Sequence, residues 1–217
     1  MLHTIKKKMG LFLLSALTSL LMAGWFSPIL SRAVAALPFS PVVGQAFSQN
    51  TADFALATAL EANVTRARSV LLTQGAAPSD LMTYVAVMNG ANVVPKSANT
   101  LARGAVGAVL SGDRLVVRGS FGHLSSPLRD YATDPVDPPN PSITSAFHIH
   151  QGDPSENGPF QYALDVMIDA PGRGGSAMGE YTLTAEQVQA LAAGRLYVDL
   201  HTTQNRGGEL RAILMPY

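Results

Sequence analysis

The sequence predicts a mainly β protein, an antiparallel Greek-key β-sandwich with one short helix in a crossover connection, preceded by an N-terminal helix. Three observations predict this class. Short runs of β-branched and aromatic residues recur from residue 81 to the end, separated by turn residues at hairpin spacing. This β region has one clear helix start signal. A stretch before residue 80 instead repeats apolar residues every three or four positions, which indicates an amphipathic helix.

Residues 1–35 are expected to be a signal peptide. A basic segment, Lys6–Lys8, precedes an apolar run, and Ala33-Val34-Ala35 supplies the small residues that a signal peptidase requires. The alternative is an uncleaved membrane anchor, because the apolar run can be extended to about Leu30. We therefore expect an exported protein (periplasmic, cell-surface or secreted) that touches a membrane only if this segment is not cleaved.

Charge argues against a nucleic-acid partner. The full chain of 217 residues has a formal net charge of zero. Cleavage after residue 35 would leave 11 basic and 15 acidic residues. Such a surface does not attract a phosphate backbone.

A linker and a helix are expected before the sandwich. Residues 36–50 are interrupted by Pro, Gly and Ser and are interpreted as the linker. Residues 51–80 form the N-terminal helical segment, in which the periodic helix spans Thr51 to Thr73. Gly75 and Pro78 then end it, so the β-sandwich domain is expected over residues 81–217.

The first half of the domain is expected to be strands and turns. The run before Asn89-Gly90 is β-prone, and this dipeptide is typical of a turn. Residues 104–110 and 114–121 flank Ser111-Gly112-Asp113 and predict a hairpin. The proline-rich residues 129–142 are predicted to be an exposed loop.

The second half adds strands and the crossover helix. Residues 145–150 are predicted to be a strand, as are residues 160–168, whose alternation places Phe160, Tyr162, Leu164, Val166 and Ile168 on one face. Thr184 and Gln187 form a capping box for a helix over residues 185–193 that ends at Gly194. Residues 195–201 and 209–215 are the closing strands, joined by a turn at residues 205–208.

Two histidines one residue apart suggest a metal site. Residues i and i+2 of a strand share a face, so His148 and His150 should point the same way. His201 lies on the polar side of the strand over residues 195–201, and three imidazoles suit zinc or copper. Asp199 or Glu209 could be a fourth ligand or could support the ligands, and His123 in a predicted turn could contribute as well.

The alternative is that these histidines are solvated or hydrogen-bonded residues on the face of a sheet. The chain has no cysteine, so disulfides and thiolate-bound metals are excluded. A G-x-G-x-x-A sequence at residues 172–177 is not interpreted as a dinucleotide site, because a β-like segment follows it where a helix is required.

Five sequence blocks resemble the CHRD (chordin) domain, in the order typical of that family and over about residues 83–214. They are MNGANVVP, VVRGSFGHLSSP, AFHIHQGDPSENGPF, LTAEQVQALAAGRLYVDLHT and NRGGELRAIL. Arg206 stands where the family usually has proline. The resemblance implies an extracytoplasmic β-sandwich module, which in animals belongs to a secreted binder of growth factors. It implies a binding or interaction module without catalytic activity, whose partner is an extracytoplasmic protein or a cell-surface ligand.

A second resemblance is local. FHIHQGD is similar to the strand that supplies two copper ligands in Cu/Zn superoxide dismutase, which is also a Greek-key sandwich. Four histidines would remain after cleavage, too few for that dinuclear site but enough for a mononuclear one. The rival hypothesis is therefore a mononuclear His-ligated protein with copper or zinc as its cofactor.

Overall fold

The computed structural model describes residues 41–217, with side chains from residue 55 onward. The expected signal peptide (residues 1–35) and the first part of the expected linker (residues 36–40) lie outside the described residues. Within the described part, no helix combines the length and the apolar character that spanning a membrane requires.

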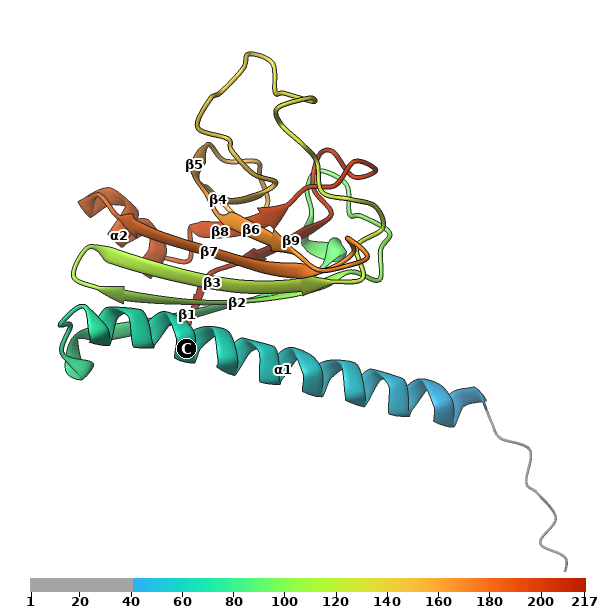
Figure 1. Ribbon diagram of the computed structural model, residues 1–217, viewed down its shortest axis with the longest axis horizontal. Coiled ribbons are helices and arrows are strands. Elements are labelled where there is room, and N and C mark those ends of the chain that lie inside the picture. The colour runs from blue at the N-terminus through green and yellow to red at the C-terminus, as the bar shows by residue number, and fades with distance from the viewer. Residues whose placement is uncertain (1–40) are drawn as a thin grey trace, which may run out of the picture. The chain divides into compact units, whose positions relative to one another are not determined.

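Two antiparallel sheets pack face to face, as the mainly β sandwich prediction requires (Figure 1). The six-stranded sheet has the order β10-β1-β2-β3-β7-β6, and the four-stranded sheet has the order β5-β4-β8-β9. The strands of the larger sheet are β1 (Leu81–Met88), β2 (Arg103–Ser111), β3 (Arg114–Gly122), β6 (Asp165–Ile168), β7 (Gly175–Thr182) and β10 (Met215–Pro216). Those of the smaller sheet are β4 (Phe147–Gln151), β5 (Phe160–Ala163), β8 (Leu196–Leu200) and β9 (Leu210–Ile213).

The long helix α1 (Pro41–Thr73) lies along the outer face of the six-stranded sheet (Figure 1). Close approach depends on Gly107 of β2, since a Cβ there would come within 2.5 Å of the backbone nitrogen of Val64. The helix ends before Gly75, whose φ of +91° favours glycine. It begins at Pro41, earlier than the expected Thr51, so residues 41–50 are helical and not a linker. Proline is tolerated in a first helical turn, and the composition of this segment alone was not enough to exclude a helix.

Local sequence signals predicted the crossover helix and the first hairpin correctly. Helix α2 (Ala185–Ala192) has the capping box, in which Thr184 and Gln187 bond reciprocally, and Gly194 follows it with a φ of +65°. It carries the chain from β7 in one sheet to β8 in the other. The β2–β3 hairpin pairs Ser111 with Arg114, and Gly112 has a φ of +63°. Two short 3₁₀ turns, Pro78–Asp80 and Gly90–Asn92, complete the elements.

Two predicted strands are in fact pairs of strands in different sheets. Residues 160–168 divide into β5 and β6 at Leu164, and residues 209–215 divide into β9 and β10 at Leu214. Both leucines are fully buried between the sheets. Alternation reports which way a side chain points but not which sheet the strand belongs to, so the predicted single strands were wrong.

A β-bulge also changes the phase of β5. The register shifts between Ile149 and His150, so that Ile149 pairs with Tyr162 but His150 pairs with Phe160. Phe160 therefore lies on the side of the histidines, whereas Tyr162 packs against the core. The prediction that Phe160 and Tyr162 share a face was wrong, because the extra residue of a bulge interrupts the alternation.

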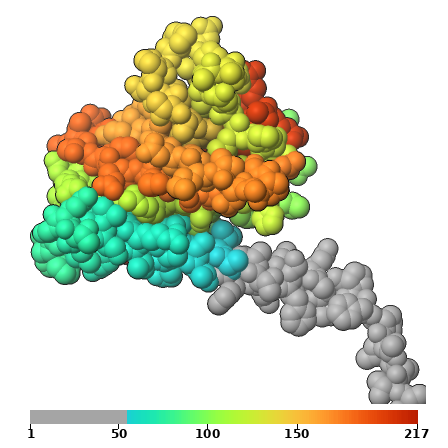
Figure 2. All heavy atoms as spheres, in the orientation of Figure 1, coloured from blue at the N-terminus to red at the C-terminus, as the bar shows by residue number. Residues whose placement is uncertain are grey.

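The second face of the small sheet is buried as well. Strand β8 is buried along its whole length, although an antiparallel sheet commonly has one solvated face. Three loops cover this face: residues 123–146, 152–159 and 201–209, which we call the covering loops. The first of them protrudes from the molecule above the sheets (Figure 2). Polar residues of β4 and β8 are thereby enclosed under loops.

Candidate metal centre

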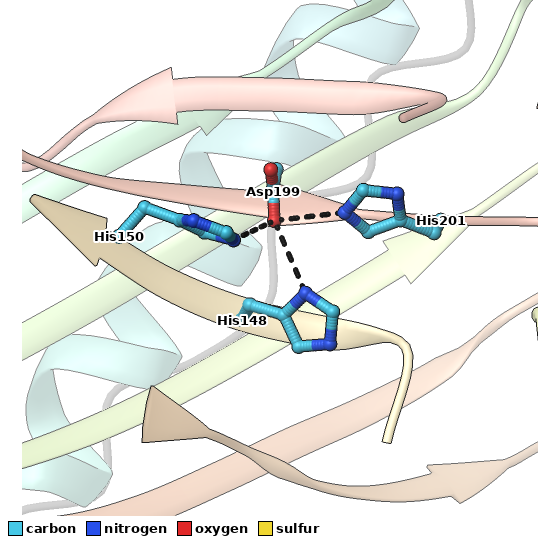
Figure 3. Close-up of side chains that lie close together, drawn as sticks. All are labelled: His148, His150, Asp199 and His201. Carbon is cyan, nitrogen blue, oxygen red and sulfur yellow. Dashed lines mark ion pairs between the residues drawn. The ribbon is translucent and has the colours of Figure 1, made fainter. Parts of the chain in front are cut away.

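Four side chains from two neighbouring strands meet on this covered face (Figure 3). His148 and His150 come from β4, Asp199 comes from β8, and His201 directly follows β8. The pairing of β4 with β8 sets His148 opposite Asp199. Each of the four residues offers one ligand atom, and these atoms all lie within 4.8 Å of one another.

The three distances to Asp199 suit the ligands of a tetrahedral ion. Oδ1 of Asp199 lies 3.2 Å from Nε2 of His150, 3.2 Å from Nε2 of His201 and 3.6 Å from Nδ1 of His148 (Figure 3). A tetrahedral zinc ion with bonds of about 2.0–2.1 Å holds its ligand atoms about 3.3 Å apart. The contacts to Asp199 are therefore close to the edges of such a coordination sphere.

Backbone carbonyls set the orientation of all three imidazoles. Nε2 of His148 lies 2.6 Å from the carbonyl oxygen of Ser145, Nδ1 of His150 lies 3.0 Å from that of Gly158, and Nδ1 of His201 lies 2.9 Å from that of Arg206. A carbonyl oxygen can only accept, so each outer nitrogen carries the proton. A neutral imidazole then turns its lone pair toward Asp199, as a metal ligand does.

Three of the inward atoms have no hydrogen-bond partner. Nε2 of His150, Oδ1 of Asp199 and Nε2 of His201 are all inaccessible to solvent, and the 3.2 Å contacts between them lack hydrogen-bond geometry. Buried polar atoms are nearly always paired, because an unpaired one loses its hydration without compensation. A cation among these atoms would satisfy all of them.

Asp199 is an anion held between this centre and Arg211. The carboxylate is 4% exposed. Burial acts to raise the pKa of Asp199, but the charge of His201 and the facing imidazoles outweigh it and hold the pKa well below its usual range. Nη2 of Arg211 lies 3.9 Å from Oδ2, and this guanidinium is itself fixed over the Tyr197 ring and by a 2.8 Å bond to Asn157. The two carboxylate oxygens thus have separate surroundings.

The buried histidines differ in their affinity for protons. Burial lowers the pKa of His148. Burial acts in the same direction on His201, but the charge of Asp199 and the contact with its carboxylate more than compensate, so the pKa of His201 is raised. In competition between a proton and a metal ion, His201 is therefore the group that holds the proton.

The structure brings together four of the six residues that the sequence singled out. Glu209 is buried elsewhere and accepts hydrogen bonds from Thr100, Ser125 and Thr202. It therefore joins loops and is no part of the centre. His123, with a φ of +59°, lines a hollow of about 210 Å³ beside α1, also away from the centre.

Sequence reasoning missed two residues beside the centre. Arg211 faces Asp199 across the β8–β9 pair, and aligning the two predicted closing strands in register could have found it. Tyr131 packs its ring 5.3 Å from that of His148 and 6.3 Å from that of His201. It comes from the proline-rich loop, where no periodic pattern points to it.

Comparison with known proteins identifies one family. A family model described as the CHRD domain matches residues 84–214, which is more than half of the chain. No curated protein matched, and no solved structure matched. The matched range contains both sheets except the first residues of β1 and the short β10, and it includes all four residues of the centre.

Proposed function

Because the chain belongs to the CHRD domain family, we propose that it is an exported module of that family that binds one zinc ion through His148, His150, Asp199 and His201. The observation that carries the proposal is the convergence of these four side chains, in which the inward atoms of His150, Asp199 and His201 are buried without a hydrogen-bond partner. Three imidazoles held by carbonyls and one carboxylate held by an arginine form a donor set that zinc accepts.

Zinc is preferred to copper because of geometry. Zinc has no geometric preference from its d electrons and is usually tetrahedral in structural sites, whereas copper(II) favours tetragonal arrangements. The 3.2–3.6 Å contacts around Asp199 favour the tetrahedron. Copper remains the natural competitor, since imidazole binds it strongly.

The enclosure supports binding and not catalysis. Catalytic zinc sites keep a position for water or substrate, while structural sites are filled by four protein ligands. Here four side chains converge, and inward atoms of His150, Asp199 and His201 are buried. The ion would therefore hold strands and loops together.

Zinc titration of the metal-free protein, purified without an affinity tag, tests this proposal. We expect one zinc ion per chain, and we expect His150→Ala or His201→Ala to weaken binding by at least about 100-fold, because each removes one of four ligands. His123→Ala is the matched control and should bind as the original chain does. Unchanged binding in the His150 and His201 variants would contradict the proposal.

Export is a separate part of the proposal, supported by the basic segment, apolar run and A-x-A box of residues 1–35. Sequencing the N-terminus of the protein recovered outside the cytoplasm should give Ala36 as its first residue. Recovery of intact Met1 in the membrane fraction would instead indicate an anchor. An interaction with an extracytoplasmic protein or a cell-surface ligand, as the CHRD family implies, is the second candidate function.

A further inference from the structure

We propose that Tyr131 is the gate of the zinc site and that an ionic clasp of Arg129, Asp134 and Arg206 holds it closed, so that opening of this loop segment controls the rate of metal exchange. The inference rests on the proposed zinc binding and concerns how the ion enters and leaves. It starts from the fact that inward atoms of the site have no access to solvent. An ion cannot reach them unless a wall moves.

Most walls of the site belong to the sheet. β4 and β8 carry the ligands themselves. Phe160 of β5 lies 5.4 Å from His148 and 6.0 Å from His150, measured between ring centroids, and Tyr197 of β8 stacks on His150 at 5.1 Å. Tyr197 lies on a strand that is paired on both sides, and Phe160 lies on the edge strand β5, which is paired with β4. They can move only if the sheet itself opens.

Tyr131 is the aromatic wall that lies outside the sheet. Its ring contacts the imidazoles of His148 and His201, but its backbone belongs to the first covering loop. Tyr131 also lines a cavity of about 430 Å³ formed within that loop by residues such as Val136, Pro139 and Ile143. Tyr131 therefore borders both the imidazoles and this cavity.

The clasp fixes this segment over the site. Nε of Arg129 donates to Oδ2 of Asp134 at 2.9 Å, and Arg206 pairs with the other carboxylate oxygen. The Arg129 guanidinium lies 4.5 Å above the Tyr131 ring. Nη1 of Arg129 also donates to the Arg206 carbonyl, which is the same oxygen that orients His201. These few contacts thus link Tyr131, the clasp and His201.

The clasp is built to open more easily than the sheet. The side chain of Arg206 is 60% exposed and that of Asp134 is 35% exposed. An ion pair in contact with water, such as that of Arg206 with Asp134, is individually weak, whereas the side chain of Arg129 is only 10% exposed. Opening requires the loss of these contacts, whereas moving Phe160 or Tyr197 requires the loss of strand hydrogen bonds. The loop therefore opens first.

A gate that supplies no ligand changes rates and not affinity. If Tyr131 covers the ion without binding it, zinc does not change the equilibrium between the closed and the open form of the loop. Association and dissociation then both scale with the fraction of open molecules, and their ratio is unchanged. This separates a gate from a ligand, whose loss would weaken the affinity itself.

The test measures zinc release from the loaded full chain after mixing with an excess of a coloured chelator. We expect Tyr131→Ala and Asp134→Asn to speed release by about tenfold or more, and association equally, with Kd within about threefold of the original value. Tyr131→Phe keeps the ring and should release zinc as the original chain does. Asp137→Asn, an exposed change in the same loop, is the matched control.

Each outcome decides the proposal. Faster exchange at constant Kd in both test variants supports it, and Asp134→Asn gives an answer even if Tyr131→Ala folds poorly. Unchanged release in both variants, with the original chain binding zinc, overturns the gate alone. A large loss of affinity in Tyr131→Phe would make the phenol a ligand and overturn the gate as well. No zinc binding by the original chain overturns both the gate and the proposed function.

Discussion

Asp199 is the residue that gives the centre its charge. Three imidazoles without it would offer only neutral donors, and its carboxylate also meets Arg211 on the opposite side. The position of Asp199 was predictable, because it lies two residues before His201 on a strand and must share its face. Its place among the candidate ligands, and not merely in the surroundings, rests on the 3.2 Å contacts with His150 and His201 that only the folded chain shows.

The raised pKa of His201 predicts how zinc affinity depends on pH. A proton on His201 must leave before the nitrogen can bind an ion, and Asp199 moves its pKa above the ordinary value of about 6.5. As the pH falls through that raised pKa, apparent affinity should fall by about tenfold per pH unit for one displaced proton. Titration calorimetry in buffers of different ionisation enthalpy should detect proton release at neutral pH. A pH-independent affinity between pH 8 and about 6 would contradict the assignment.

The same shift has the opposite consequence for the metal-free protein. A histidine whose folded-state pKa is raised stabilises the fold below its unfolded-state pKa, and this stabilisation is lost as the pH rises through the folded-state pKa. Acid should therefore favour the His201–Asp199 pair while it weakens zinc binding. His148 has the opposite effect on the stability of the metal-free fold. Burial lowers its pKa, so protonating it in acid is unfavourable in the folded state.

Among the elements, those defined by local signals were predictable and those defined by distant pairing were not. The capping box of α2 and the turn between β2 and β3 depend on residues a few positions apart, and both were predicted correctly. The switches between sheets at Leu164 and Leu214, and the bulge opposite Ile149, depend on which strands pair. Hydrophobic alternation carries no information about the pairing partner.

The switch at Leu164 provides a test of the core. Leu164 is fully buried where the chain passes from β5 to β6, and its backbone nitrogen donates to Phe147 at 2.8 Å. Leu164→Ala should lower the free energy of unfolding by about 2–5 kcal/mol through the lost contacts and the resulting cavity. The neighbouring Asp165→Ala, an exposed change, should cost less than about 0.5 kcal/mol. Similar losses for the two variants in denaturant unfolding would mean that Leu164 is not a core residue.

The covering loops explain why the candidate site could be predicted only in part. The alternation of side chains along two strands was enough to group His148, His150 and His201 on one face, because successive residues of a strand point to opposite faces. The enclosure comes from loops, whose paths depend on contacts far apart in sequence. The carbonyl acceptors of the three imidazoles lie at Ser145, Gly158 and Arg206, one in each covering loop. No periodic pattern predicts such positions.

For the whole molecule, zinc would act as a link between the sheet and all three loops. Each imidazole would bind the ion through one ring nitrogen, and its other ring nitrogen bonds to a loop carbonyl. An ion that binds only the folded state stabilises it by about 2.7 kcal/mol when its free concentration is 100 times Kd. Without cysteine, the chain has no disulfide to fix these loops. A bound metal would therefore add rigidity to these loops.

The most direct test of the zinc site is anomalous diffraction at the zinc absorption edge, from crystals of the zinc-loaded protein. The peak should lie about 2.0–2.1 Å from Nδ1 of His148, Nε2 of His150, Oδ1 of Asp199 and Nε2 of His201, in a tetrahedral arrangement. It should lie among the four side chains drawn in Figure 3, between Oδ1 of Asp199 and the three imidazole nitrogens that face it. A well-ordered centre without a zinc peak, or a peak at other residues, would contradict the proposed site.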